Sequence, residues 1–284
     1  MLTFPAAYLA FDNSSAKAQT LFNRVRRGEL VCLVIASAAA VIPGRAAAVL
    51  AVLFFLAALF LRASNTSSEA EKRWYQARAA AESVKSMSWQ YAVGGESFRL
   101  SQGDVDEAFR ARLLKIANEL DSIDVGPPNG SVGAITPEMR RLRSGSISVR
   151  HDFYIDNRVR DQKNWYSAKA ELNRKRASQW RVAIVSLEAL AVLLGMARIL
   201  EFFDADLLGV LAAAAAGCAA WFQMRNYAGL SVAYALTAHE IDILDGSYVD
   251  GNDEQAWAQF VHDAEAAFSR EHTMWLARKQ GPIG

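Results

Sequence analysis

Cysteine is almost absent from the sequence, and the two that occur, Cys32 and Cys218, both lie inside apolar stretches. Two distant thiols in such surroundings indicate neither a disulfide framework nor a zinc site. The chain also lacks a Gly-rich phosphate loop after a strand, a Ser or Cys nucleophile with a suitable His partner, and paired CxxC motifs. We therefore expect a protein that is not an enzyme and that uses no metal and no cofactor.

An excess of charge of either sign is missing too, because 31 Lys and Arg residues stand against 30 Asp and Glu residues. A nearly neutral balance gives no reason to expect nucleic acid as a partner. The first 15 residues have neither a basic lead-in nor an apolar core, so we expect no signal peptide. The overall composition resembles that of a soluble protein, but the apolar residues are concentrated in two blocks.

Each apolar block reads as a helical hairpin. The later block, from Val182 to Met224, has two runs near the length of a bilayer span on either side of a short acidic corner. The earlier block has shorter runs around the turn Pro43-Gly44-Arg45. The expected spans are residues 28–43, 46–62, 182–199 and 207–224. None of them keeps a polar face, which favours membrane spans over the alternative, buried core hairpins of a soluble helical protein.

The expected fold class is therefore an all-α polytopic membrane protein, with two transmembrane helical hairpins extended by long cytoplasmic helices. Lys and Arg residues are concentrated beside the open ends of the hairpins, opposite the turns. Each turn carries a single arginine, Arg45 or Arg198. Because basic residues are retained on the cytoplasmic side, we expect both termini and the long middle segment to be inside.

Residues at alternating steps of three and four predict helix seams of the coiled-coil type, on helices that extend the membrane spans. The first seam contains small residues that permit close helix approach, and the second continues on both sides of the later hairpin. The seam residues are Trp74, Ala77, Ala81 and Val84 in the first, and Trp165, Tyr166, Trp180, Tyr227, Leu230 and Tyr234 in the second.

A Gly- and Pro-rich stretch at residues 121–135 predicts a flexible loop. Near it we divide the chain into two modules, residues 1–125 and 126–284. Ser101 and Asp104 suggest a capping box before this loop, and Thr136-Pro137 suggests a helix start after it. Residues 1–12 are expected to be a loose lead-in to a basic helix over residues 15–27, which either anchors the first span inside or lies on the membrane surface.

Glu188 is the only charged residue in the first arm of the later hairpin before Arg198. A carboxylate inside a span is unfavourable unless it faces a bundle interior or water, so Glu188 is a candidate for lining a pore in an oligomer. The alternative is a shallow position from which Glu188 reaches headgroup water near Arg181 or Arg198.

Aromatic and basic residues outside the spans allow two interpretations. Four tryptophans can stack on a nucleotide base, with Arg140, Arg141 and Arg143 contacting phosphate. Tryptophan at heptad spacing is more often core, however, and a short arginine run is more often a solvated surface. The tryptophans are Trp74, Trp89, Trp165 and Trp180, of which Trp180, like Trp221, can also be an interfacial anchor.

Two histidines of the last helix, His262 and His272, with Glu265 between them, offer a weak metal-site pattern. Ten residues place the two histidines on different helix faces, so a solvated helix surface is the better interpretation of all three residues.

A Trp-Tyr motif occurs twice, at Trp74–Glu82 after the first hairpin and at Trp165–Glu171 before the second, which is not a simple head-to-tail duplication. With the residues around it, this pattern resembles the SLATT family of bacterial two-transmembrane effectors across nearly the whole chain, as a tandem pair of modules. The residues that carry the resemblance are Trp74, Tyr75, Arg78, Ala81, Glu82, Ser83, Lys85, Trp89 and Tyr91, then Arg158, Asp161, Gln162, Trp165, Tyr166, Lys169, Ala170 and Trp180, and finally Trp257, Phe260, Val261, Glu265, Glu271, His272 and Trp275.

The resemblance implies an effector of the bacterial inner membrane that is triggered during conflict, such as phage infection, and then permeabilises the membrane. It also implies an upstream sensor or nucleotide-producing protein as partner, since no sensor domain is recognisable in the chain. Our first hypothesis is an antiviral, pore-forming homo-oligomer in contact with membrane lipid. The alternative is a non-conducting membrane anchor or scaffold that recruits a cytoplasmic partner.

Overall fold

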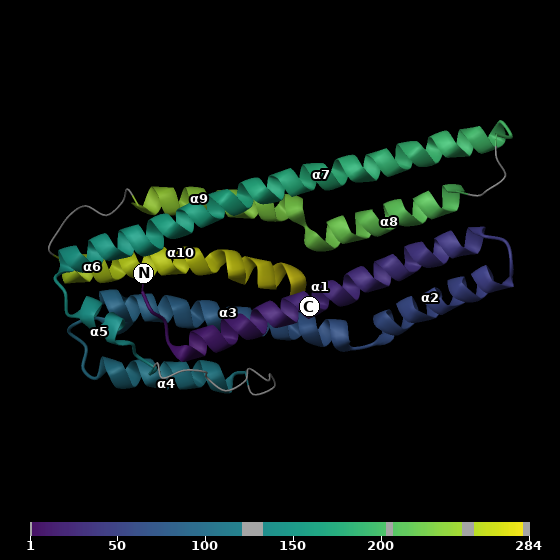
Figure 1. Cartoon of the computed structure of the whole chain (residues 1–284). Helices are drawn as coiled ribbons and strands as arrows, with labels where there is room; N and C mark the ends of the chain where they lie inside the picture. Colours follow the sequence, from purple (N-terminus) through teal and green to yellow (C-terminus); the bar gives the residue numbers. More distant parts are fainter. Residues whose placement is uncertain (1, 121–132, 203–206, 246–252, 281–284) are drawn as a thin grey trace. The chain divides into compact units, whose positions relative to one another are not determined.

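The computed structural model describes residues 2–120, 133–202, 207–245 and 253–280. The described residues form helices and no strand, which confirms the all-α class (Figure 1). The predicted module boundary at residue 125 and most of the predicted loop lie outside the described residues. The helices are α1 (Ala6–Val41), α2 (Arg45–Ala63), α3 (Thr66–Val93), η1 (Glu96–Phe98), α4 (Val105–Asn118), α5 (Pro137–Arg143), α6 (Ile147–Tyr154), η2 (Ile155–Val159), α7 (Arg160–Ile199), α8 (Leu207–Arg225), α9 (Tyr227–Asp245) and α10 (Glu254–Gln280).

One order of elements occurs twice along the chain. A long helix is followed by a helix of 19 residues and then by a further helix: first α1, α2 and α3, and again α7, α8 and α9. The Trp-Tyr motif occupies different places in the two sets, because Trp74 lies on α3 and Trp165 lies on α7.

Three of the described helices are long and apolar enough to cross a membrane: α2, the helix through Ile147–Ile199 and the helix through Leu207–Leu244. The prediction of a helical membrane protein is confirmed. The predicted first span at residues 28–43 is not among the three, because α1 ends at Val41 and charged residues accompany its apolar part. The count of four spans therefore stays a prediction.

The chain forms two compact units, which we call the core unit (residues 1–17, 73–170 and 232–284) and the hairpin unit (residues 18–72 and 171–231). The core unit has the interior of a soluble helical protein. Its fully buried large side chains include Tyr91, Phe98 and Phe109 from the first half and Tyr154 and Trp257 from the second. Both halves of the chain therefore contribute to the larger of the hydrophobic clusters in this unit.

The N-terminal residues differ from the prediction of a loose lead-in. Helix α1 begins at Ala6, and Phe11 is buried against α3 residues such as Ala81. The Ser15 hydroxyl donates to the Trp74 carbonyl at 3.3 Å. Hydrophobic burial stabilises the N-terminal turns of α1, which composition alone does not reveal.

The predicted helix starts are partly right. Thr136 caps α5 as expected, because its hydroxyl accepts from the Met139 amide at 3.1 Å, and Pro137 is the first helical residue. For α4 the expected Ser101 cap is wrong. Asp104 is the N-cap instead, with its carboxylate accepting from the Glu107 amide at 2.9 Å.

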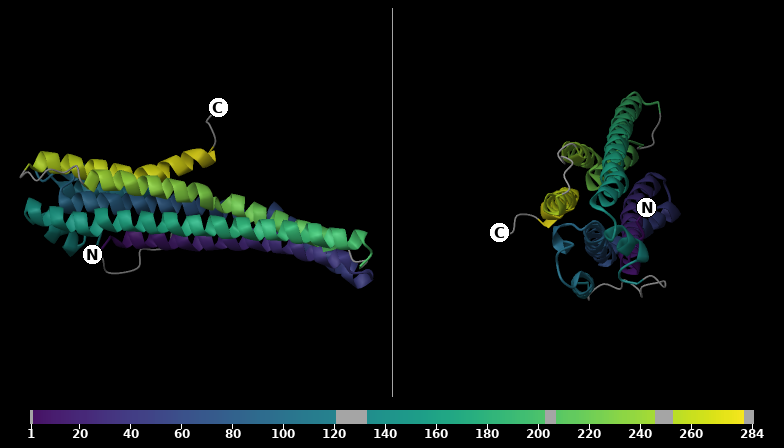
Figure 2. Two further views of the ribbon diagram at one scale, coloured as in Figure 1. Left: turned by 90° about the horizontal axis from the view of Figure 1, so that it is seen from above. Right: turned by 90° about the vertical axis from the view of Figure 1, so that its left-hand side faces the viewer.

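The helix expected to extend the third span exists, with one irregularity. It begins at Ile147, and Ile155–Val159 form a π-helical turn before α7 continues without interruption to Ile199. Figures 1 and 2 both show α7 as one long helix. The helix expected to continue unbroken after the fourth span is interrupted instead at Asn226, whose φ is 45°. One residue in the left-handed region is enough to separate α8 from α9.

The hairpin unit packs through small residues and presents large apolar ones outward. Its buried positions are mainly alanines. Small side chains let membrane helices pack closely, and this packing holds them together where no hydrophobic effect does. Leu53 and Phe60 on α2, and Val192 on α7, are more than half exposed. Such surfaces fit lipid as solvent. The buried alanines are Ala18, Ala36, Ala39, Ala51, Ala58, Ala70, Ala177, Ala191 and Ala215.

Candidate functional site

Glu188 lies exposed on α7, within the later hairpin. Its helix neighbours Val185 and Val192 are 57% and 60% exposed, so the carboxylate interrupts an outward apolar surface. Glu188 has no hydrogen bond or ion pair with any residue in the described ranges. The described part of a single copy therefore supplies no partner for this carboxylate.

The depth of Glu188 follows from helix geometry. It lies six residues beyond Val182, where the apolar run begins, which is about 9 Å along the axis of an α-helix. The hydrocarbon layer is about 30 Å thick, so this position is well inside it for a helix near the bilayer normal. A short glutamate side chain reaches headgroup water less easily from there than a long lysine or arginine does.

Glu29 is a second acid of the hairpin unit, and the sequence alone did not single it out. It is buried on α1 and accepts from Arg26 at 3.1 Å and from Arg62 of α2 at 3.0 Å. The pairs join the two helices of the first hairpin. A lone acid beside an apolar run is the signal in the sequence, but the arginines around it predict only the orientation of the hairpin.

The first predicted seam lies on α3 in the core unit. Ala77, Ala81 and Val84 have no exposed surface, and Trp74 is half-buried with its ring stacked on Tyr75 at 4.6 Å between centroids. These positions pack helices against one another.

The second predicted seam contains an aromatic cluster of the core unit. The rings of Trp165 and Tyr166 on α7 each lie 5.7 Å from the ring of Tyr234 on α9. Tyr166 is buried, whereas Trp165 is 37% exposed. The remaining seam residues belong to the hairpin unit: Tyr227 is buried, and Trp180 and Leu230 are half-buried.

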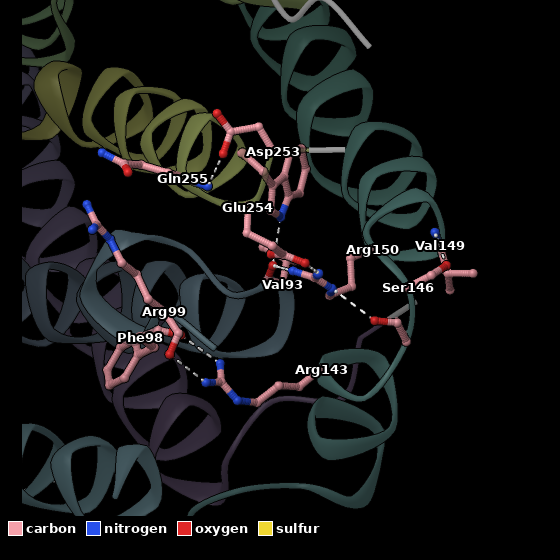
Figure 3. Close-up of polar contacts among 12 residues, drawn as sticks. Val93, Phe98, Arg99, Arg143, Ser146, Val149, Arg150, Asp253, Glu254 and Gln255 are labelled. Atoms are coloured by element: carbon pink, nitrogen blue, oxygen red, sulfur yellow. Dashed lines mark hydrogen bonds and ion pairs between the residues drawn. The ribbon is translucent and has the colours of Figure 1, made fainter. Parts of the chain in front are cut away.

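The arginines considered for phosphate binding are engaged within the protein. Arg143 donates to the carbonyls of Phe98 and Arg99 at 2.8 and 3.1 Å (Figure 3). It also donates to the carbonyl of Tyr91 at 2.8 Å, which closes the end of α3. Arg140 pairs with Asp106 at 2.6 Å, and Arg141 lies 3.9 Å from Glu138. The three guanidinium groups therefore have separate partners.

Trp89, one of the four tryptophans considered for base stacking, is 2% exposed and has the rings of Phe4, Phe153 and Tyr154 around it. A ring so enclosed by the protein's own aromatic residues is part of the core.

The expected solvated surface of the last helix is wrong for Glu265. His262 is exposed, but Glu265 is 1% exposed and accepts from Arg158 at 2.9 and 2.7 Å and from the Tyr154 hydroxyl at 2.9 Å. Burial alone would lower the pKa of Arg158, but the Glu265 carboxylate outweighs it and raises that pKa. Burial and Glu265 raise the pKa of Tyr154, so the phenol stays protonated. Arg158 lies on the π-turn η2.

Arg150 makes a second connection between the halves of the core unit. Its side chain is 1% exposed, donates to the Val93 carbonyl at 2.8 Å and to the Gly145 carbonyl at 3.1 Å, and pairs with Glu254 of α10 (Figure 3). The Trp257 indole donates to the same Val93 carbonyl at 2.7 Å. The end of α3 is therefore held by residues from the second half of the chain.

Comparison with known protein families gives one match for each half. Residues 5–151 match the SMODS and SLOG-associating 2TM effector domain 3, and residues 154–275 match the SMODS and SLOG-associating 2TM effector domain 1. Neither the curated proteins nor the solved structures contain a match to the chain. The junction between the two domains lies in α6, directly before the π-turn. The chain belongs to the family of SMODS and SLOG-associating two-transmembrane (SLATT) effectors, with two such domains in tandem.

Proposed function

We propose that this protein is a non-enzymatic effector of a bacterial antiviral system that forms homo-oligomers and permeabilises the inner membrane when activated. The observation that carries the proposal is Glu188, exposed on an apolar span and without a partner among the residues that the structure describes. On an insertion scale, an acid at the centre of a span costs about 2.5–3.5 kcal/mol. Contact with other copies around a water-filled path removes most of that cost.

A ring of Glu188 carboxylates would give such a path a preference for cations, as acidic rings do in channels. The small-residue packing of the hairpin unit supports a closed resting state, because alanine-lined helix contacts leave little space between the helices. The basic residues at the open ends of the hairpins, opposite the turns, support a topology with both termini in the cytoplasm.

The activating input acts on the core unit in this proposal, through a sensor protein or a nucleotide signal produced upstream. Helix α7 contributes residues to both units and is continuous from Arg160 to Ile199. The π-turn directly before it holds one extra residue per turn. Its conversion to α-helix would rotate α7 by about 100° relative to α6, since an α-helix has 3.6 residues per turn. Such a rotation changes the direction in which Glu188 points.

The test is membrane potential and cation leakage during controlled expression in a bacterial host under phage challenge. We expect the wild-type chain to depolarise the membrane and Glu188→Gln to reduce the cation leak several-fold. Glu201→Gln is the matched control, because Glu201 is an exposed acid just after the same helix and should leave the leak unchanged.

An intact membrane potential with the wild-type protein under challenge would overturn the proposal. If Glu188→Gln left host protection unchanged while substitutions in the core unit abolished recovery of a partner protein, the non-conducting scaffold would be the better explanation.

A further inference from the structure

Three arginines of the hairpin unit surround two buried aromatic rings. The guanidinium carbon of Arg27 lies 4.6 Å from the centre of the Trp221 ring, and that of Arg225 lies 5.8 Å from the same ring. Arg225 also lies 5.6 Å from the centre of the Tyr227 ring, and Arg176 lies 5.9 Å from it. The two rings, both 5% exposed, thus connect three guanidinium groups from α1, α7 and α8 into one cluster.

This arginine cluster has no counter-charge among the described residues. None of its three members has an ion pair there, and Glu29, the acid of the hairpin unit on α1, is already bound to two other arginines. The Nη1 group of Arg225 donates to the Asn23 side chain at 3.2 Å, but its Nε is buried without a hydrogen-bond partner. Three like charges with a free buried donor favour an external anion.

The sequence position of the cluster fixes its depth. Arg27 lies just before the apolar run of α1, Arg225 is the last residue of the apolar helix α8, and Arg176 lies six residues before the apolar run of α7 begins at Val182. Trp221, one turn before Arg225, occupies the position of an interfacial tryptophan. Residues just outside the apolar runs of membrane helices lie at the level of lipid headgroups.

We propose that Arg27, Arg176 and Arg225 bind the phosphate group of an anionic phospholipid. Guanidinium groups match phosphate oxygens with paired, charge-assisted hydrogen bonds, and basic sites between membrane helices bind anionic headgroups. The site joins helices of both hairpins, so a bound lipid would stabilise their packing. This inference requires only that the chain is inserted in a membrane. It does not depend on pore formation.

The experiment titrates phosphatidylglycerol or phosphatidylcholine into the purified full-length protein in detergent and counts bound lipids by native mass spectrometry. We expect tight binding of phosphatidylglycerol and an affinity lower by about 25-fold in Arg27→Gln/Arg225→Gln, from roughly fivefold per arginine. The control is Arg174→Gln/Lys175→Gln, which removes the same charge from α7, where both residues already pair with Glu171. It should lose much less affinity.

Inorganic phosphate tests whether the bound anion is a lipid headgroup or a soluble phosphate. Phosphatidylcholine tests whether the lipid must carry a net negative charge. Equal losses in the two double variants would overturn the proposal, because general surface charge would then explain the binding. Competition by inorganic phosphate at a concentration equal to that of the lipid would also overturn it in favour of a soluble anion. If the double variant fails to fold, Arg27→Gln alone tests the proposal. Because Arg27 is exposed, this variant should fold and lose about fivefold in affinity.

Discussion

The ion pair between Arg158 and Glu265 is closed to solvent on both sides, with 2% and 1% of the two side chains exposed. Removing one partner of such a pair leaves an uncompensated buried charge, so we expect Glu265→Gln to destabilise the core unit by about 3–5 kcal/mol. Urea unfolding followed by tryptophan fluorescence in detergent measures the change. The double substitution Arg158→Met/Glu265→Leu should be less harmful than Glu265→Gln, because it leaves no charge unpaired.

A neighbouring pair on the same π-turn provides the control for this prediction. Asp156 pairs with Arg160, but the two side chains are 58% and 59% exposed. Asp156→Asn should therefore change the unfolding free energy by no more than about 1 kcal/mol. Similar effects of Asp156→Asn and Glu265→Gln would show that burial does not decide the strength of these pairs.

Single residues also mark where the sequence stops being informative. Glu188 could be recognised because a lone acid in an apolar run is visible without a structure. Glu265 could not, because its partner Arg158 is 107 residues away and the exposed His262 beside it suggests a solvated surface. The pairing of Glu29 with Arg26 and with Arg62 of α2 depends on how the hairpin folds, so the sequence alone does not show it.

At the scale of elements, the helices follow from patterns that are local in sequence. Apolar runs predicted three of the helices that can cross a membrane, and Thr136-Pro137 predicted the start of α5. The π-turn at Ile155–Val159 and the break at Asn226 were not predictable, because the residues there are compatible with an uninterrupted α-helix. Tertiary context routinely overrides local propensity. Arg158 on the π-turn, for example, pairs with Glu265, which is distant in sequence.

The end of α3 gives a prediction at this scale. Gly94 has a φ of 77°, and a Cβ added there would lie 2.9 Å from the Arg150 guanidinium and 3.4 Å from Leu100. We expect Gly94→Ala to destabilise the core unit by at least about 1–2 kcal/mol, since a residue with a Cβ is strained in the left-handed region. Thermal unfolding measures this loss. Gly103→Ala, where no atom lies within 4 Å of the added Cβ, should shift the midpoint little, and an equal shift would contradict the argument.

At the scale of the whole molecule, the two family domains do not coincide with the two compact units. The domains divide the chain between residues 151 and 154, whereas each unit contains helices from both domains. The sequence indicated the tandem repeat, but it could not show that both copies share a core, because that depends on pairings such as Trp257 with Val93. Each of the two tandem domains thus supplies part of the hydrophobic core of the core unit.

The shared core predicts that neither half folds its part of the core unit alone. A cut between Ser144 and Gly145, which separates α5 from α6, leaves residues 1–144 without Trp257 and Glu265, and leaves residues 145–284 without Tyr91 and Phe98. Each fragment then exposes large apolar side chains that are buried in the intact chain. We expect each fragment, expressed alone, to be protease-sensitive outside its hairpin and to lack a cooperative unfolding transition. The two fragments expressed together should copurify and regain the transition. Cooperative unfolding of either fragment by itself would mean that each domain has its own core, and the tandem would then be two linked units rather than one.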